Sequence, residues 1–359
     1  MTPPMTPRKR VEVALAGGHA DKVPFTMYES MIPQCTVERD MRNRGLCIVH
    51  RKVQAVKRHH PNVKICDQRW NEDGKALTRS YFETPHGTLT RLDEKAGFTS
   101  WHHEKMWKSP DDYKALLFFR QDVQFEPNYE AFAAAEAWMG EDVICRTGLG
   151  MQPLQGLITG RLMGMEDFCI EWMERRDEIL KLYDALVENQ RKLYPLVAAS
   201  PASHANYGGN LVSAIVSPQM YREYYLPHYH EAAEVMHKAG KYVGSHYDGN
   251  CGPLAEVIAA DPLDYIEAFT PAPDSDMTLA EARAAWPEKV LWLNFPSSLH
   301  LRPAEEVAAA AFDLVEQAGP DGLIVGITED MPGDRWRETC PAIMDGLDRH
   351  AAGRPERYA

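Results

Sequence analysis

One histidine and three carboxylates stand where the sequence predicts that three strands end. His246 and Asp248 follow one short apolar run, Glu267 lies in the next run, and Glu329 follows the last one. In a parallel α/β barrel the carboxyl ends of the strands meet at one rim, and catalytic groups gather there. An imidazole together with several carboxylates is a ligand set for a divalent metal ion. These residue types therefore predict a metal site with nitrogen and oxygen ligands.

A simpler interpretation of the same residues stays open. His246 and Asp248 would also suit a hydrogen-bonded pair at a barrel mouth, and Glu267 and Glu329 would suit structural ion pairs. Asp330 stands beside Glu329, so the last ligand is either of the two.

The elements that must position these side chains alternate between strand-like and helix-like patterns. Most of the strand-like runs are separated by amphipathic helical patterns, which is typical of a (β/α)8 barrel. An open, doubly wound sheet is the alternative, but no glycine fingerprint for phosphate binding follows any run. The sequence thus predicts an α/β fold, a (β/α)8 TIM barrel that forms a single domain over residues 1–359. The predicted barrel strands are Val23–Tyr28, Asn62–Cys66, Asp142–Thr147, His204–Tyr207, Lys241–Ser245, Leu263–Phe269, Val290–Asn294 and Leu323–Thr328.

Two additions to a plain barrel are predicted. A helix is expected over residues 5–18, because Thr6-Pro7 is typical of a helix start and Gly17-Gly18 of a stop. An antiparallel β-hairpin is expected as an insert over about 76–98, since two alternating runs flank the turn residues 84–87.

Composition excludes several classes of function. The 359 residues carry 39 Lys and Arg against 52 Asp and Glu, a net charge of −13, which argues against nucleic acid or an anionic membrane as partner. No apolar run approaches the roughly 20 residues that span a bilayer, and the N-terminus lacks the apolar centre of a secretory signal. The 7 cysteines are scattered without CxxC spacing, which favours reduced thiols. We therefore expect a cytoplasmic protein.

Several segments carry a family resemblance. They are Thr6–Arg10 with Asp21–Pro24, Ser217–Tyr224 with Leu226–Tyr229, His237–Lys241, His246–Asn250 and Asp276–Ala282. In these segments, which span most of the predicted barrel, the chain resembles the uroporphyrinogen decarboxylase superfamily. That superfamily includes decarboxylases and corrinoid-linked methyltransferases.

The methyltransferase branch resembles this chain more closely. The decarboxylases carry Arg-Gln-Ala-Gly-Arg after the first strand, whereas Tyr28–Pro33 stands there in this chain and offers a glutamate instead of arginines. A substrate rich in carboxylates would meet unfavourable electrostatics. Methyltransferase relatives hold zinc through a His-x-Cys pair, a glutamate and a later cysteine. The resemblance implies a Zn²⁺ site at His246, Asp248, Glu267 and Glu329, with both thiolates replaced by carboxylates.

That replacement suggests the reaction. A harder, oxygen-rich site suits polarisation of an oxygen more than activation of a thiol. The resemblance then implies an O-demethylating methyltransferase, which transfers a methyl group from a methoxylated, aromatic substrate to the Co(I) corrinoid (cobalamin) of a partner protein. The expected partners are this corrinoid protein, a small methylated substrate and, by comparison with relatives, a second copy in a homodimer.

Further residues receive roles in this scheme. The candidates for protonating the leaving oxygen are Tyr247, Tyr207 and His204. The predicted substrate cup, largely apolar with a few polar groups, is formed by Met27, Tyr28, Glu29, Met151, Asn206, Phe269 and Asn294.

Three other functions are alternatives for this sequence. A metal-independent decarboxylase, similar to uroporphyrinogen decarboxylase but acting on a smaller acid, would need basic groups in the mouth, for which Arg69, Arg146 and Arg161 are candidates. A hydrolase or lyase would use the same metal to activate water. A non-catalytic binding protein on a barrel is disfavoured, because clustered acids without a counter-charge are costly to maintain.

Overall fold

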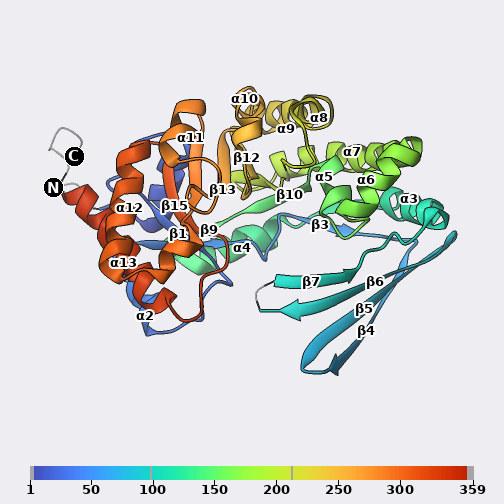
Figure 1. The fold of residues 1–359 in the computed structure, drawn as a ribbon, viewed down its shortest axis with the longest axis horizontal. Coiled ribbons are helices and arrows are strands. Elements are labelled where there is room, and N and C mark those ends of the chain that lie inside the picture. Colours follow the sequence, from blue (N-terminus) through green and yellow to red (C-terminus); the bar gives the residue numbers. More distant parts are fainter. Residues whose placement is uncertain (1–3, 98, 212, 354–359) are drawn as a thin grey trace. The chain divides into compact units, whose positions relative to one another are not determined.

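The fold was analysed in a computed structural model that describes residues 4–97, 99–211 and 213–353. The chain forms two compact units (Figure 1). The first comprises Met1–Gln54, Tyr129–Gly148 and Pro201–Ala359, and the second comprises Ala55–Asn128 and Leu149–Ser200. A single domain over residues 1–359 stays a prediction.

A nine-stranded parallel sheet has the order β10-β11-β12-β13-β14-β15-β1-β2-β9. Its strands belong to the first unit, except that β10 runs on from Gly148 into residues of the second. Only Arg146 separates β9 from β10 in the sequence, although these strands lie at opposite ends of the order. The sheet therefore curves into a nearly closed barrel, and the predicted α/β barrel is confirmed. The strands are β1 (Phe25–Tyr28), β2 (Leu46–His50), β9 (Val143–Cys145), β10 (Thr147–Met151), β11 (His204–Gly208), β12 (Tyr242–His246), β13 (Tyr265–Phe269), β14 (Val290–Asn294) and β15 (Leu323–Ile327).

The second barrel strand lies elsewhere than predicted. The strand β2 is Leu46–His50, whereas the predicted Asn62–Cys66 overlaps β4 (Lys64–Glu72), an exposed antiparallel strand of the second unit. Buried parallel strands are continuous apolar runs, and Leu46–Val49 is such a run after the left-handed Gly45. The missed signal for β4 is the turn Asp73-Gly74, where both residues have positive φ, as in a two-residue hairpin turn.

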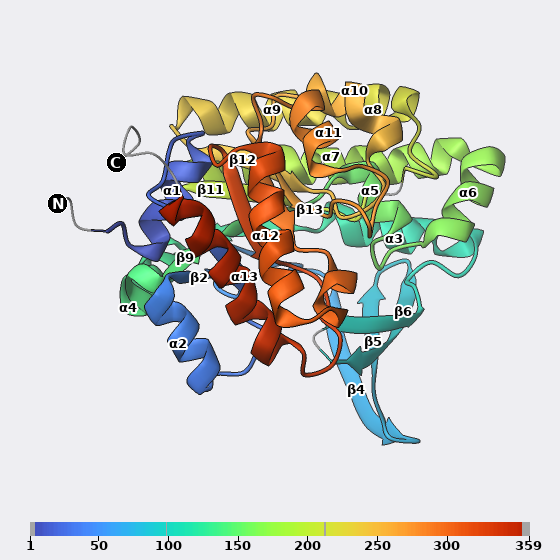
Figure 2. The same cartoon turned by 60° about the vertical axis from the view of Figure 1, so that its left-hand side comes forward.

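Helices surround this sheet in the first unit (Figure 2). Thr278 and Glu281 form a capping box at the start of α11, and the Ser217 hydroxyl caps α8. The bounds are α1 (Pro7–Leu15), α2 (Thr36–Arg44), α4 (Tyr129–Met139), α8 (Pro218–Tyr224), α9 (Leu226–Lys238), α10 (Ala255–Ala259), α11 (Leu279–Ala285), α12 (Ala304–Ala318) and α13 (Trp336–Ala352), with short 3-10 helices η2 (Gly140–Asp142), η3 (Gly252–Leu254) and η4 (Ser297–Leu301).

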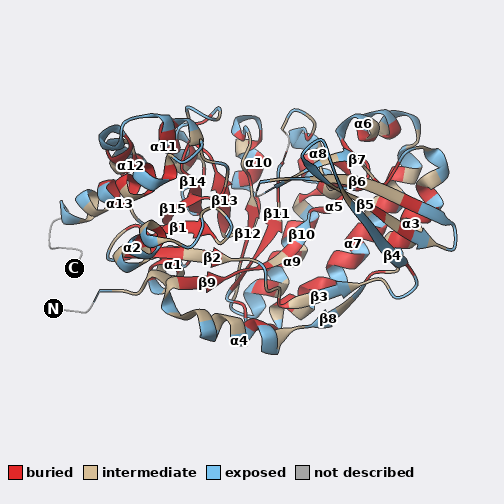
Figure 3. Cartoon of the chain, turned by 90° about the horizontal axis from the view of Figure 1, so that it is seen from below, coloured by how far each residue is buried: buried red, intermediate tan, exposed pale blue. Residues whose placement is uncertain are grey.

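The second unit combines helices with antiparallel sheets. A four-stranded sheet in the order β4-β5-β6-β7 contains β5 (Lys75–Thr84) and β6 (Gly87–Ala96), which pair in the segment where the hairpin insert is predicted; Phe98 lies outside the described residues. Figure 3 shows the barrel strands mostly buried and β4 exposed along its length. The other elements are β7 (Thr99–Glu104), the pair β3 (Val56–His59) and β8 (Gln124–Pro127), η1 (Pro110–Asp112), α3 (Tyr113–Gln121), α5 (Pro153–Ile158), α6 (Met165–Glu174) and α7 (Arg176–Ala198).

None of the helices in the described part of the chain combines the length and the apolar character that crossing a membrane requires.

Candidate functional site

Three of the predicted ligand residues come together at the carboxyl ends of β12 and β15. The Nε2 atom of His246 lies 3.6 Å from Asp248 Oδ2 and 3.4 Å from Glu329 Oε1. One ligand atom from each residue lies within 4.8 Å of the others, and all three side chains are partly buried. Within the described ranges this is the one group of three or more His, Cys, Asp or Glu side chains with such spacing. It can hold a divalent cation with one nitrogen and two oxygen donors.

Glu267 lies on the opposite side of the His246 ring. Its side chain has no exposed surface, and its Oε2 lies 2.7 Å from His246 Nδ1. Its Oε1 lies 2.8 Å from Arg146 Nη1 and also accepts from the Tyr28 hydroxyl, while the Asn206 amide donates to Oε2 at 3.3 Å. With both oxygens engaged in this way, Glu267 is placed behind the histidine. Carboxylates in this position fix the orientation and tautomer of a metal-binding histidine.

The buried charges around Glu267 compensate one another. Burial alone would raise the pKa of Glu267, but Arg146 and His246 outweigh it and hold that pKa far below the usual range. Burial would lower the pKa of Arg146, and Glu267 raises it instead. The pKa of Tyr28 rises to about 12, first because of burial and then because of Glu267. Glu267 is thus a permanent anion, and Tyr28 keeps its proton.

The backbone of β13 directs Glu267 to this position. Ala268 has φ of 63°, which is rare for a residue with a side chain, and the pairing of β13 with β14 shifts between Glu267 and Phe269. Such bulges change the direction of a side chain near functional sites. Phe269 is fully buried, with its ring centroid 5.6 Å from that of Trp286 in edge-to-face geometry.

Asn294 and Gly209 hold the backbone beside the other ligands. The Oδ1 atom of Asn294 accepts from the backbone N–H groups of Thr328 at 3.0 Å and Glu329 at 3.2 Å. This fixes the segment after β15, and Glu329, not Asp330, joins the group around His246. Gly209 lies so near His246 that a Cβ built on it would be 1.6 Å from the His246 carbonyl oxygen. A side chain at position 209 would displace His246.

Arg51 stacks on the ring of Tyr28. Its guanidinium carbon lies 3.4 Å from the centre of the Tyr28 ring, and its Nε lies 3.4 Å from Glu29 Oε2. Cations attract the face of an aromatic ring in this geometry. Met27 is buried at 1% exposure, and the amide of Asn206 also donates to the Tyr207 carbonyl oxygen at 2.9 Å.

The predicted proton donors have other contacts. The Tyr247 hydroxyl bonds to the hydroxyls of Tyr221 and Tyr229 at 3.0 and 2.9 Å, and Tyr207 packs edge-to-face on Tyr229. Burial first, and then Tyr229, raises the pKa of Tyr247 well above its usual range. The rings of Tyr247 and Tyr207 therefore belong to a buried tyrosine cluster.

His204 begins β11 and is fully buried, with its ring centroid 6.1 Å from those of Tyr265 and Trp292. Its Nδ1 lies 3.1 Å from Ser203 Oγ, and its Nε2 has no partner among the described residues. Burial, with a contribution from Arg146, lowers its pKa to about 3. His204 is a neutral core side chain.

Met151 and Cys251 are not members of the ligand group. Met151 belongs to the second unit, is 37% exposed, and accepts a hydrogen bond at its carbonyl oxygen from Gln190. Cys251 is buried, donates to the Gly249 carbonyl oxygen, and has a pKa raised to about 12 by burial and then by Asp276. It is a neutral thiol and offers no thiolate.

Sequence reasoning missed the role of Arg146. The sequence suggested it only as a substrate-binding cation, whereas its guanidinium neutralises Glu267. The available signal was its position directly after the buried run Val143–Cys145, where a charged side chain at a strand end needs a counter-charge.

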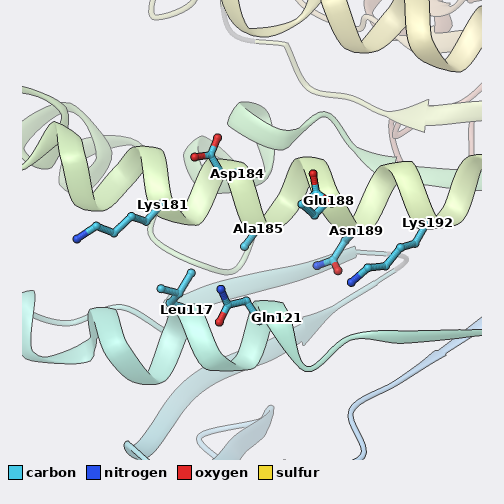
Figure 4. A pocket seen from close by; sticks show the side chains of 8 residues that line it. All are labelled: Leu117, Gln121, Lys181, Asp184, Ala185, Glu188, Asn189 and Lys192. Atoms are coloured by element: carbon cyan, nitrogen blue, oxygen red, sulfur yellow. The ribbon is translucent and has the colours of Figure 1, made fainter.

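A groove of about 440 Å³ lies in the second unit, along α3 and α7 (Figure 4). It contains none of the predicted site residues. Its lining mixes both signs of charge with amides and two apolar side chains: Leu117, Gln121, Lys181, Asp184, Ala185, Glu188, Asn189 and Lys192.

Replacing Glu267 by glutamine should destabilise the protein. The variant leaves the Arg146 charge buried without its counter-charge, and breaking a buried pair in this way costs about 3–5 kcal/mol. The free energy of unfolding in urea would measure the loss. The double variant Glu267→Gln/Arg146→Met should recover part of it, because both buried charges are then removed. Losses that simply add up in the double variant would contradict the coupling.

Acid should destabilise the protein partly through His204. Its pKa in the folded state, about 3, lies below the value near 6.5 of an unfolded histidine, so the unfolded chain binds the proton first. The stability gained from the neutral ring is complete above about pH 6.5 and falls as the pH drops towards 3. Between pH 7 and pH 5 the wild type should lose about 2 kcal/mol more unfolding free energy than His204→Phe. Equal losses in the two proteins would contradict this assignment.

Comparison with solved structures bears on the fold. No family model and no curated protein matches the chain. Among solved structures, a methyltransferase from Methanosarcina mazei is similar, with a TM-score of 0.56 at 13% identity over 94% of this chain and 98% of that one. A structure of the pneumococcal virulence factor StrH gives a TM-score of only 0.38 at 10% identity, over 92% of this chain and 84% of that one. The first likeness shows that this chain shares the fold of that protein.

Proposed function

We propose that this protein is a zinc-dependent methyltransferase that removes a methyl group from an aromatic methyl ether. The acceptor in this proposal is the Co(I) corrinoid of a partner protein. The observation that carries the proposal is the group His246, Asp248 and Glu329, held from behind by Glu267. The fold shared with the Methanosarcina mazei methyltransferase and the superfamily resemblance of the sequence support the reaction class.

The donor chemistry fits a divalent cation that accepts both nitrogen and oxygen ligands. Two partly exposed carboxylates face the Nε2 of His246, while Nδ1 is taken by Glu267, so the ring has one nitrogen available for a metal. We assign Zn²⁺ to His246, Asp248 and Glu329, and we place Glu267 as the residue that orients the histidine. When bound, the cation would supply a positive charge that stabilises a leaving alkoxide or phenoxide oxygen.

Other residues of this chain orient the ligand side chains. His246 donates its Nδ1 proton to Glu267 in this scheme, which keeps the Nε2 lone pair directed at the ligand group. Arg146 keeps Glu267 anionic, and Asn294 fixes the backbone of Glu329. Because Tyr28 and Asn206 already donate to Glu267, they hold the carboxylate in one orientation.

Proton donation to the leaving oxygen is not assigned to Tyr247, Tyr207 or His204. Their rings lie in the buried tyrosine cluster or in the core, and the hydroxyl of Tyr247 is committed to two other tyrosines. With a metal to stabilise the anion, the product oxygen can instead be protonated by solvent after it leaves the site.

The decarboxylase alternative depends on a free cation near the site. Arg146 is only 7% exposed and is paired with Glu267, so it offers no free charge to a substrate carboxylate. Arg51 is paired with Glu29 and stacked on Tyr28. These contacts favour the metal-dependent reaction.

The metal assignment predicts a specific pattern of metal content. Protein purified without a metal-chelating column should contain about one zinc per chain by mass spectrometry, and His246→Ala, Asp248→Asn and Glu329→Gln should each lose most of it, because each removes one of three ligands. Asp330→Asn is the matched control, since Asp330 is adjacent to Glu329 but outside the group. A wild type that stays free of zinc after reconstitution, or a metal loss that is equal in Asp330→Asn, would overturn the site.

The methyl transfer predicts a corrinoid-dependent reaction. Under anaerobic conditions, the protein should convert Co(I) cobalamin and an aryl methyl ether to methylcobalamin and a phenol. The loss of Co(I) absorbance measures the rate of this reaction. His246→Ala should reduce this rate at least about 100-fold, while Asp330→Asn should retain it. Release of the phenol without corrinoid would instead identify a metal-dependent hydrolase, and full activity in His246→Ala would refute the mechanism.

A further inference from the structure

The strand β4 (Lys64–Glu72) forms an open edge of the four-stranded sheet in the second unit. It pairs with β5 on one side and is the first strand in the sheet order. Every residue of β4 is exposed except Trp70, which is partly exposed. The backbone N–H and C=O groups along such an edge are a template for another strand. Natural proteins usually protect an edge of this kind or use it.

Two of the usual protections, a proline and a β-bulge, are missing from β4. The strand contains no proline, and its pairing with β5 runs from Lys64–Glu83 to Glu72–Lys75 without a shift in register. At the other edge of the sheet the pairing of β6 with β7 shifts between Leu92 and Asp93. Of the two edges, β4 is the one suited to a partner.

The charges along β4 have the symmetry of a self-complementary strand. We propose that β4 pairs antiparallel with β4 of a second copy of this chain, about a two-fold axis that passes through Gln68. In that register Lys64 lies opposite Glu72, and Asp67 lies opposite Arg69. Each pair occurs twice by symmetry, and residues directly opposite one another point to the same face of the sheet.

Neighbouring registers lack this complementarity. A shift of the axis by half a residue in either direction brings no opposite charges of the two β4 strands together. A shift by a full residue places Asp67 opposite the second Asp67, or Arg69 opposite the second Arg69. Like charges directly opposite each other destabilise a sheet. The charge pattern therefore selects one register and a closed, two-fold dimer, in which the same surface of each copy is used.

The ion pairs that the charged side chains of β4 make within one copy do not prevent the pairing of two β4 strands. Lys64 and Glu83 are 3.0 Å apart with side-chain exposures of 68% and 47%, and Arg69 and Asp67 are 3.1 Å apart with exposures of 76% and 36%. Exposed pairs of this kind are weak and exchange partners easily. Pairing between copies would cover them and complete the backbone hydrogen bonds of both edges.

A charge-swap series in the full chain tests the proposal by sedimentation velocity. The wild type should form a concentration-dependent dimer, and Asp67→Arg should raise its Kd at least about tenfold, because arginine would face Arg69 twice. The double variant Asp67→Arg/Arg69→Asp should restore the dimer, since it exchanges the signs. Glu126→Arg, on β8, changes the net charge equally and should leave the Kd unchanged. Far-UV circular dichroism of each variant establishes folding.

A disulfide test fixes the register independently of charge. In a Cys66→Ser background, Gln68→Cys should form a disulfide-linked dimer under mild oxidation, because the two introduced thiols meet at the axis. Asn71→Cys in the same background should not, since the two copies of residue 71 lie six positions apart in this register. A monomer at all concentrations, a dimer that Asp67→Arg leaves unchanged, or equal cross-linking at positions 68 and 71 would each overturn the proposal.

Discussion

The buried negative charge of Glu267 is the interaction on which the candidate site depends. A carboxylate with no exposed surface is stable only when positive groups and hydrogen-bond donors surround it. Arg146 supplies the counter-charge, His246 and Tyr28 lie against its oxygens, and Asn206 completes the set. The donors come from several different strands, so the balance of charge exists only when the barrel is assembled. The stability of the fold and the geometry of the site therefore rest on the same contacts.

The position of Arg146 connects this charge balance to closure of the sheet. It is the single residue between β9 and β10, which stand at the two ends of the strand order. Its side chain reaches Glu267 on β13, so an ion pair links the seam of the barrel to the strand that orients His246. A shift of Arg146, between β9 and β10, would therefore move the His246 imidazole through the Glu267 carboxylate.

Short-range backbone features then bring the three ligand residues together. The positive φ of Ala268 directs Glu267, the close approach of Gly209 leaves room for the His246 carbonyl, and Asn294 accepts two backbone N–H groups beside Glu329. None of these three residues has to touch a metal or a substrate for this role. Such constraints explain how a site of flexible carboxylates can have a defined geometry before a ligand binds.

The second unit follows a different principle, because β4 is exposed along its length and its pattern of charges suits another copy of itself.

Much of this protein is determined by local features of its sequence. The apolar runs near Tyr28, His246 and Asn294 predict barrel strands because burial requires apolar side chains, and His246 and Asp248 are rim residues because a strand ends there. The sequence left the last ligand open between Glu329 and Asp330, and the tertiary structure brings Glu329 to His246. Local patterns failed where the decisive partner is distant in sequence. Asn62–Cys66 resembles a strand, but its antiparallel partner β5 and the Asp73-Gly74 turn place it in another sheet. Likewise the sequence shows that Glu267 is a carboxylate at a strand end. Only the tertiary structure decides that Arg146 and His246 Nδ1 lie against its two oxygens. The energy of a buried charge depends on neighbours that the fold brings together, and sequence spacing does not encode them.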